Sequence, residues 1–505
     1  MRKISFLLFT LLALLYVTNA NALIVNDTFT RDGNTYRVTQ MIPGTVPGTT
    51  KTYNVAFVSS TNTTVNIPAT VADPHNQYTF NVTAIANNST VPNATSVTMP
   101  NTIVRIEANA FKDGNITSIT IPQSVKEIQS GAFGQMSHLT AINVDAANPN
   151  FRSDNGVLIE KKDSKEWVAA YPLARPDAEY TVPEGVYGVY TNAFQRASYL
   201  TKITLPASLK ESPSTAEFNG YTSAQNLREI AVAAGNTAFK SVDGVLLSAD
   251  GKKLIAYPNG KAGSPSTNPA YQGVTGQPAA SVYKIPDGVE SIEQAAFAQV
   301  NGLTAIELNG VKKLAKGAFD KAVKLRNVLL GSSVDTIEDG AFGGNNDLAA
   351  FDVDPANPNY TADNGVIYTK NKEELVLFPA GKAGEYTTLT TTKKIRNRAF
   401  YYAQKVTKVN FNSNLEVIDN DAFQATTKLA NITFEAPAKI KTIGTFAFQG
   451  SGLTELNIPA SLQVVSWSAF GSTKLKKVTV ADGSQLHSIN TGAFNGCKDL
   501  EEFTF

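Results

Sequence analysis

The 505-residue chain is poor in the side chains that build disulfides and metal centres. Its one cysteine, Cys497, excludes an intramolecular disulfide and a cysteine-based zinc site. The three histidines, His75, His138 and His487, are far apart in the sequence, which argues against a histidine metal cluster. Lys and Arg number 44 against 43 Asp and Glu, so the chain has no charge excess that would favour nucleic acid or an anionic membrane. We therefore expect no metal, no cofactor and no nucleic-acid partner.

Long apolar runs are also absent, except at the N-terminus. Residues 1–22 combine the basic Arg2 and Lys3, an apolar run over residues 4–17 and small residues up to Ala22. This is the pattern of a signal peptide cleaved near Ala22. No later run is long enough to span a membrane, so we predict a secreted or cell-surface protein with no membrane span after cleavage. Export with so little cysteine indicates a bacterial protein.

A repeated Ala-Phe pair dominates the rest of the chain. Successive uninterrupted pairs are 22 to 25 residues apart. A fixed period of this length is the signature of a solenoid, in which each repeat stacks on the next. The phenylalanines of these pairs are Phe111, Phe133, Phe194, Phe297, Phe319, Phe342, Phe400, Phe423, Phe448, Phe470 and Phe494.

Two further positions are locked to each Ala-Phe pair. Five to six residues after the Phe comes a motif L-x-x-I-x-L, as in Leu303, Ile306 and Leu308. Its last two apolar residues are two apart, so both lie on one face of a β-strand. Another aliphatic residue, such as Ile292, stands five residues before the Phe. One unit cannot bury these groups alone, so we predict about twelve stacked repeats of 22–25 residues with parallel strands.

The repeat unit resembles the BspA-type leucine-rich repeat of bacterial surface proteins. The best match to its pattern V-x-x-I-x-x-x-A-F-x-x-x-x-x-L-x-x-I-x-I-P runs from Ser124 to Val144. The resemblance implies a leucine-rich-repeat solenoid, β-rich within the α/β class. It also implies a non-enzymatic, adhesin-like protein that binds host proteins such as fibronectin and fibrinogen, or other bacteria.

Three long gaps between Ala-Phe pairs each hold the same extra cassette. Each cassette has an Asp-Gly or Asn-Gly turn signal and two β-rich runs, which predicts an inserted β-hairpin. Before the repeats, an alternating segment reads as an N-terminal β cap, or alternatively as a small independent β domain. The predicted organisation is a signal peptide over 1–22, a cap over 23–95, and a solenoid over 96–505 with cassettes near 145–180, 233–285 and 354–390.

The cassettes are rich in Asp and Asn, which leaves two interpretations open. Residues such as Asp352, Asp354 and Asn357 could ligate calcium, although their spacing fits no EF-hand loop. Asp and Asn also form turns by bonding to their own backbone, and we favour this second interpretation.

No catalytic motif is present. The sequence contains no His-Glu-x-x-His, no Gly-x-Ser-x-Gly and no phosphate-binding loop, so we predict that the protein is not an enzyme. A hydrolase remains a remote alternative, because a pair of carboxylates can be assembled in space without a sequence motif.

The repeat spacing predicts which side chains face a partner. The residue between the last two apolar positions of each L-x-x-I-x-L motif points outward, as does the residue two before it. We expect a host matrix or surface protein to bind there, and the oligomeric state stays open. A glycan that binds exposed cassette aromatics is the alternative, and Phe378, Tyr401 and Tyr402 are further aromatics expected to be exposed. The candidate binding residues are Lys202, Thr204, Glu307, Asn327, Lys408 and Asn410 on the strands, and Trp167, Tyr171, Tyr257 and Tyr368 in the cassettes.

Overall fold

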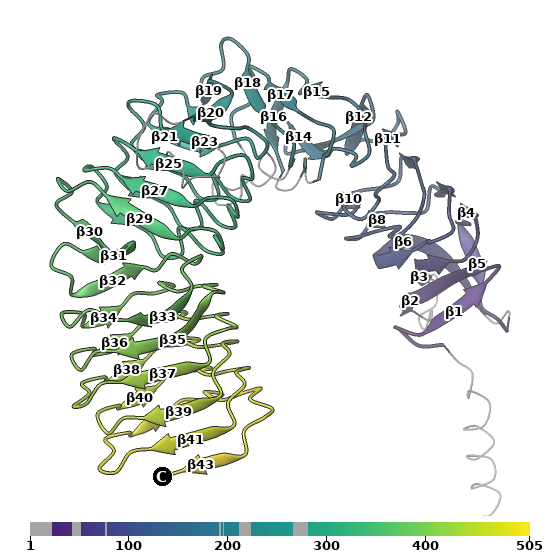
Figure 1. Cartoon of the computed structure of the whole chain (residues 1–505). Helices are drawn as coiled ribbons and strands as arrows, with labels where there is room; N and C mark the ends of the chain where they lie inside the picture. The colour runs from purple at the N-terminus through teal and green to yellow at the C-terminus, as the bar shows by residue number, and fades with distance from the viewer. Residues whose placement is uncertain are drawn as a thin grey trace, which may run out of the picture. The chain divides into compact units, whose positions relative to one another are not determined.

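The computed structural model describes residues 23–42, 52–75, 78–190, 193–194, 196–211, 224–265 and 281–505 (Figure 1). These residues form strands and turns and contain no helix, so none of them belongs to a helix that could cross a bilayer. They divide into two compact units. The first runs to Ser164 and includes Ala169–Arg175, and the second comprises Lys165–Val168 and Pro176–Phe505. The predicted signal peptide, 1–22, lies outside the described residues.

Most repeats contribute a strand of three or four residues, which we call a repeat strand. Its apolar residues alternate with outward-facing ones. In most coils, successive repeat strands pair in parallel without a register shift; for example, Ile306 pairs with Val328, and Val328 pairs with Phe351. This arrangement follows from the L-x-x-I-x-L spacing, because a period of two buries one face only. The repeat strands are β4 (Thr64–Asn66), β7 (Ser96–Thr98), β9 (Ser118–Ile121), β11 (Ala141–Val144), β15 (Glu179–Thr181), β17 (Lys202–Leu205), β18 (Glu229–Val232), β23 (Ser281–Lys284), β25 (Ala305–Leu308), β27 (Asn327–Leu330), β29 (Ala350–Val353), β33 (Gly384–Thr387), β35 (Val406–Phe411), β37 (Asn431–Phe434), β39 (Glu455–Ile458), β41 (Lys477–Val480) and β43 (Glu502–Thr504).

A second set of strands carries the aliphatic residue that precedes each Ala-Phe pair. These short strands also stack in parallel, as Ile395, Ile418 and Ile443 do. The predicted solenoid of stacked parallel strands is therefore confirmed, with short strands and turns where other α/β solenoids have helices. The short strands are β8 (Arg105–Ile106), β10 (Glu127–Ile128), β16 (Val186–Val189), β24 (Ser291–Ile292), β26 (Lys313–Leu314), β28 (Thr336–Ile337), β34 (Lys394–Ile395), β36 (Val417–Ile418), β38 (Thr442–Ile443), β40 (Val464–Val465) and β42 (Ser488–Ile489).

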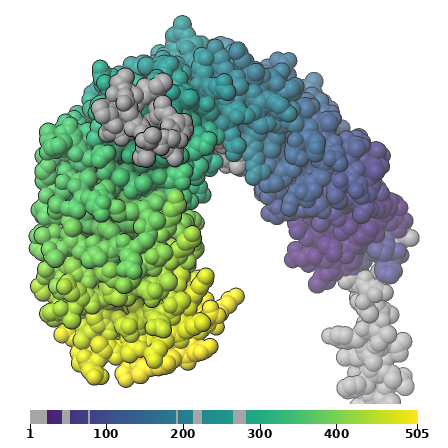
Figure 2. All heavy atoms as spheres, in the orientation of Figure 1, coloured from purple at the N-terminus to yellow at the C-terminus, as the bar shows by residue number. Residues whose placement is uncertain are grey.

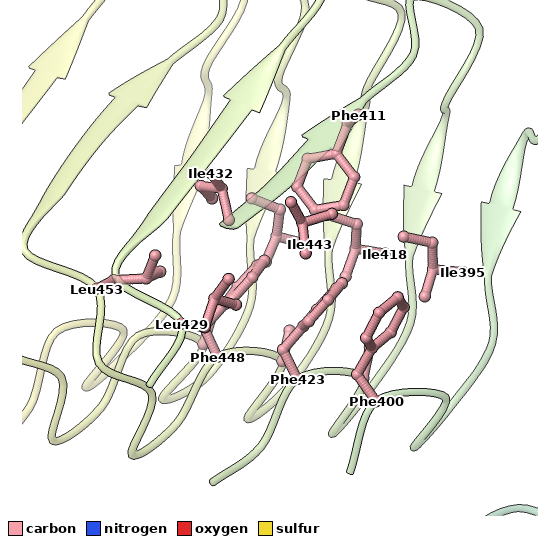
Figure 3. Close-up of a cluster of buried hydrophobic side chains, with 14 of the residues drawn as sticks. Ile395, Phe400, Phe411, Ile418, Phe423, Leu429, Ile432, Ile443, Phe448 and Leu453 are labelled. Carbon is pink, nitrogen blue, oxygen red and sulfur yellow. The ribbon is translucent and has the colours of Figure 1, made fainter. Parts of the chain in front are cut away.

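The phenylalanines of the Ala-Phe pairs stack into a ladder along the core (Figure 3). Phe400, Phe423, Phe448 and Phe470 are buried, and their ring centroids follow one another at 4.3, 4.8 and 5.2 Å. The rings of Phe423 and Phe448 are 3° from parallel. The distance between successive ring centroids is close to the distance between hydrogen-bonded strands, so each coil adds one ring without disturbing its neighbours.

The turn that holds each Ala-Phe pair, the Ala-Phe turn, has a fixed backbone conformation. Residues two before and two after the Phe take left-handed φ values, such as Asp421 at +52° and Ala425 at +60°. Each turn bonds the next, since Phe423 N donates to Ala447 O over 2.6 Å and Phe448 N to Ala469 O over 2.7 Å. The alanine is fully buried where these backbones meet, which explains why a small residue is needed there.

The first unit begins with a sheet of longer strands. β1 and β2 are antiparallel, as are β2 and β3, but β6 is parallel to β3 and then to β8, so the sheet continues into the short strands. Parallel pairing of repeat strands also starts inside the predicted cap, between β4 and β7. The longer strands are β1 (Thr28–Arg31), β2 (Asn34–Ile42), β3 (Thr52–Ser60) and β6 (Thr79–Thr90), with β5 (Thr70–Ala72) along the edge of β6.

Each cassette contains three strands rather than the two that the sequence suggested. In the second and third cassettes the three are successively antiparallel, and the last pairs in parallel with the next short strand. The additional first strand begins three residues after a turn asparagine in each cassette, at Phe151, Phe239 and Tyr360. The cassette strands are β12 (Phe151–Asp154), β13 (Val157–Lys162) and β14 (Lys165–Ala170); β19 (Phe239–Val242), β20 (Val245–Ser248) and β21 (Lys253–Ala256); and β30 (Tyr360–Asp363), β31 (Val366–Thr369) and β32 (Glu374–Leu377). A two-residue strand, β22 (Ser264–Pro265), pairs antiparallel with β23.

An asparagine fixes the start of each cassette. Asn357 is buried, its Nδ2 donates to Gly331 O and Val334 O at 2.9 and 3.0 Å, and its Oδ1 accepts from the backbone of Asn359 and Tyr360. Asn148 and Asn236 repeat this geometry in the other two cassettes. In these three asparagines the side-chain amide forms hydrogen bonds with the backbone, as the turn interpretation requires.

Candidate binding surface

The outward side chains of the repeat strands form rows within each sheet, and we call these rows together the strand face. In the sheet from β23 to β29 its central column runs Lys284, Glu307, Leu329 and Asp352, each directly opposite the next. Thr387, Asn410 and Thr433 form the same column from β33 to β37. Thr433 Oγ1 donates to Asn410 Oδ1 over 2.8 Å, and Asn410 Nδ2 donates to Thr387 Oγ1 over 3.1 Å. The strand face thus carries an ordered row of polar side chains.

Charges on the strand face pair with one another across coils. Lys202 Nζ lies 3.1 Å from Glu229 Oε1, and Lys408 Nζ lies 3.4 Å from Glu385 Oε2. Near the last repeat strand, Lys477 donates to Glu502 over 2.8 Å and holds the pKa of that carboxyl below its ordinary value. Such exposed pairs contribute little to stability, but they leave the surface close to neutral.

The six predicted strand residues all lie on this face and are partly exposed. Lys202 and Thr204 are both on β17, and Lys408 and Asn410 are both on β35. Glu307 on β25 and Asn327 on β27 are on neighbouring strands, where Asn327 is opposite Ala305. The structure therefore places these residues in three groups along the stack rather than in one compact site.

The prediction that the cassette aromatics are exposed is wrong for Tyr171, Tyr257, Tyr368 and Phe378, which are all buried. Two of them occupy the phenylalanine ladder. Tyr257 stacks on Phe297 at 5.0 Å, and Phe378 stacks on Phe400 at 4.2 Å. Tyr368 hydrogen-bonds through its hydroxyl to Tyr386, and burial raises the pKa of both phenols. A cassette must keep the ladder continuous, so these four aromatics lie in the core rather than on the surface.

Trp167 differs from the other cassette aromatics because it remains partly exposed. Its ring stacks 5.3 Å from Tyr190 and stands edge-on to Tyr187 at the same distance. Lys165 Nζ lies 3.8 Å from the centroid of the Tyr187 ring. This packing holds Trp167 against the molecule, although one side of it is accessible.

Two exposed aromatics lie instead on the Ala-Phe turns. Side chains three and two residues before each ladder phenylalanine, and one or two residues after it, form a second surface that we call the turn face. There Tyr402 is 38% exposed, as its sequence position suggested, and Trp467 is 47% exposed. Trp467 and its neighbour Phe446 were missed, because the repeat motif assigns no role to the residues just before Ala-Phe. Trp467 is three residues before its Phe, where most other repeats have a polar residue such as Asn420 or Thr445. Phe446 is two residues before its Phe, where several other repeats have glycine.

The described residues include a shallow polar depression and no group of side chains suited to a metal ion. A shallow polar depression of about 400 Å³ borders the third cassette. Its Arg396 pairs with Glu374 at 2.6 Å, and its Glu373 pairs with Lys393 at 2.5 Å. Within the described ranges no three acidic, His or Cys side chains are arranged to hold a metal ion.

In the space-filling view the successive green and yellow coils of the second unit pack closely against one another (Figure 2).

The repeats match a known family over most of the chain. The model of the BspA type leucine rich repeat region matches six copies, over residues 50–154, 178–242, 279–377 and 385–505. The chain belongs to this family of bacterial leucine-rich-repeat proteins, as its sequence motifs predicted.

Several solved structures align with the chain at low sequence identity and low TM-score. A leucine rich cell surface protein from Faecalibacterium prausnitzii is 16% identical, with 96% of each chain covered and a TM-score of 0.39. The pneumococcal vaccine antigen PcpA is 17% identical, with 95% of this chain and 94% of that chain covered and a TM-score of 0.34. A leucine-rich repeat protein from Eubacterium ventriosum is 19% identical, with 69% and 82% covered and a TM-score of 0.41. No match was found among curated proteins.

Proposed function

We propose that this chain is an exported bacterial surface protein that binds macromolecules, in the manner of an adhesin, and has no enzymatic activity. Membership of the BspA-type family supports the proposal. The observation that carries it is the strand face, on which partly exposed and mainly polar side chains repeat from coil to coil. A flat, near-neutral surface suits a large partner that makes many weak contacts better than it suits a small ligand.

A host matrix or surface protein is the partner that this surface favours. Residues such as Lys408 and Asn410 would contact it, and several coils would contribute at once. Because several charges of the strand face already pair with one another, and the chain as a whole is close to neutral, binding should depend only weakly on ionic strength.

Solid-phase binding of the processed chain, residues 23–505, tests this proposal. Immobilised matrix proteins, host cells and other bacteria would be probed at 50 and 300 mM salt. We expect saturable binding to at least one of them, with less than a threefold change between the two salt concentrations. No binding to any of these targets would contradict the proposal. A hydrolase screen on the same preparation tests the absence of enzymatic activity, and turnover of any substrate would overturn it.

A further inference from the structure

We propose that the turn face between Tyr401 and Trp467 binds a neutral oligosaccharide. This inference goes beyond the proposed function, because it concerns another surface and another class of ligand. It places a glycan site away from the cassette tyrosines, which are buried.

Two aromatic pairs mark the ends of this surface. Tyr402 stands against Tyr401 with centroids 4.7 Å apart and an angle of 74°, and Trp467 stands against Phe446 at 4.6 Å and 67°. Edge-to-face contact holds one ring of each pair in place and leaves Tyr402 and Trp467 exposed. Each pair thus offers a fixed apolar platform to a ligand, at little conformational cost.

A glycine keeps the space beside the Trp467 ring open. Gly492 lies in the Ala-Phe turn of the next coil, two residues before Phe494, where φ is +69°. A Cβ there would lie 3.6 Å from Trp467 Nε1. A larger side chain at this position would extend across the indole. The indole N–H has no hydrogen-bond partner among the described residues, so it can donate to a ligand.

Amide groups lie between the two aromatic pairs. Gln424 Nε2 donates to Gln449 Oε1 over 2.7 Å, which fixes both side chains. The other amide atoms, Gln424 Oε1 and Gln449 Nε2, have no partner in the part of the chain that the structure describes. One can accept and the other can donate, which is what the hydroxyls of a sugar require.

The charged groups on this stretch are already paired. Arg398 Nε lies 3.5 Å from Asp421 Oδ2, and the Arg398 guanidinium carbon lies 5.0 Å from the centroid of the Tyr401 ring. A surface of amides and aromatics with internally paired charges fits an uncharged ligand better than an acidic one.

The coil spacing sets the length of the ligand. Three ladder steps of 4.3, 4.8 and 5.2 Å separate the coil of Tyr401 and Tyr402 from the coil of Trp467. An extended ligand of several sugar rings can span them, whereas a single sugar would reach only one aromatic pair. The aromatic pairs are divided by amides and form no continuous apolar patch, which a protein interface would need at its centre. An oligosaccharide therefore fits better than a protein.

Binding to a glycan array, followed by titration with the tightest linear neutral oligosaccharide, tests the inference. The chain has two tryptophans, so the variant Trp167→Phe leaves Trp467 as the only tryptophan reporter. We expect the oligosaccharide to change Trp467 fluorescence saturably and to protect it from acrylamide quenching. Trp467→Ala and Tyr402→Ala should each weaken binding about tenfold or more.

Matched variants separate lost contacts from lost folding. Tyr199 is another exposed tyrosine, 55% accessible and outside this surface, so Tyr199→Ala should bind like the parent chain. Trp467→Phe keeps a platform and should retain more binding than Trp467→Ala. No binding on the array, or equal binding by Trp467→Ala and the parent, would overturn the inference. A tenfold effect of Trp467→Ala on binding to an unglycosylated protein, with none on glycans, would also overturn it and leave the strand-face proposal standing.

Discussion

Regular coils and cassettes both continue the phenylalanine ladder, but they place their other aromatic side chains differently. A regular coil adds one phenylalanine to the ladder and can expose side chains around its Ala-Phe turn, such as Tyr402 and Trp467. A cassette must remain in phase with the same ladder, so it buries its aromatics and begins at an asparagine bonded to the preceding coil. The difference teaches that the inserts serve the core, whereas the exposed aromatics Tyr402 and Trp467 belong to regular coils.

Replacing one phenylalanine of the ladder should have the largest effect on the free energy of unfolding. Phe423 is fully buried between Phe400 and Phe448, so Phe423→Ala leaves a cavity and should lower the free energy of unfolding by about 3–5 kcal/mol. Phe503→Ala is the matched control, because Phe503 is 36% exposed and should cost clearly less. Urea denaturation of both variants measures this difference, and equal losses would contradict the role of the ladder.

The cassette asparagine should come next. Asn357→Ala removes two bonds donated to Gly331 O and Val334 O and two accepted from the backbone, in a fully buried site. We expect a loss of about 2–3 kcal/mol, since buried carbonyls are left unpaired. The control is Asn359→Ala, which alters an exposed asparagine of the same turn. If the two variants unfold at the same urea concentration, the asparagine does not fix the cassette.

A smaller effect, of opposite sign, should follow from relieving backbone strain. Ala425 has a φ of +60°, and the equivalent residue one coil later is Gly450 at +66°. Ala425→Gly should stabilise the protein by up to about 1 kcal/mol, because the left-handed conformation costs alanine more than glycine loses in chain entropy. Ala422→Gly, at a fully buried position of the same turn, should instead destabilise it. A destabilised Ala425→Gly variant in thermal denaturation would contradict the strain argument.

The smallest effect should appear as a dependence of the protein's stability on pH. Burial raises the pKa of Asp320, although Lys321 and Arg398 oppose the shift. The folded protein therefore loses stability as pH rises from the ordinary Asp pKa of about 3.9 to the raised folded value. Asp320→Asn should be more stable than the parent at pH 7, and the gain should vanish below about pH 3.5. A gain that is equal at both pH values would show that ionisation is not its cause.

Sequence alone predicts the regular coils well and the cassettes poorly. The Ala-Phe spacing predicts the ladder, and L-x-x-I-x-L predicts which side of a repeat strand faces outward, because both depend on local periods. The burial of Tyr257 depends on Phe297, 40 residues later in the sequence, and no local period links the two. The exposure of Trp467 likewise depends on Gly492 in the next coil.

The central claim, that regular coils rather than cassettes carry partner recognition, can be tested with two matched double variants. Lys408→Ala/Asn410→Ala alters the strand face, and Lys370→Ala/Asn371→Ala removes the same residue types from the exposed tip of the third cassette. Binding isotherms would be recorded against the matrix or surface protein that the solid-phase assay captures. We predict about tenfold weaker binding for the first variant and unchanged binding for the second. Loss of binding in the cassette variant, with the strand-face variant unaffected, would contradict the claim.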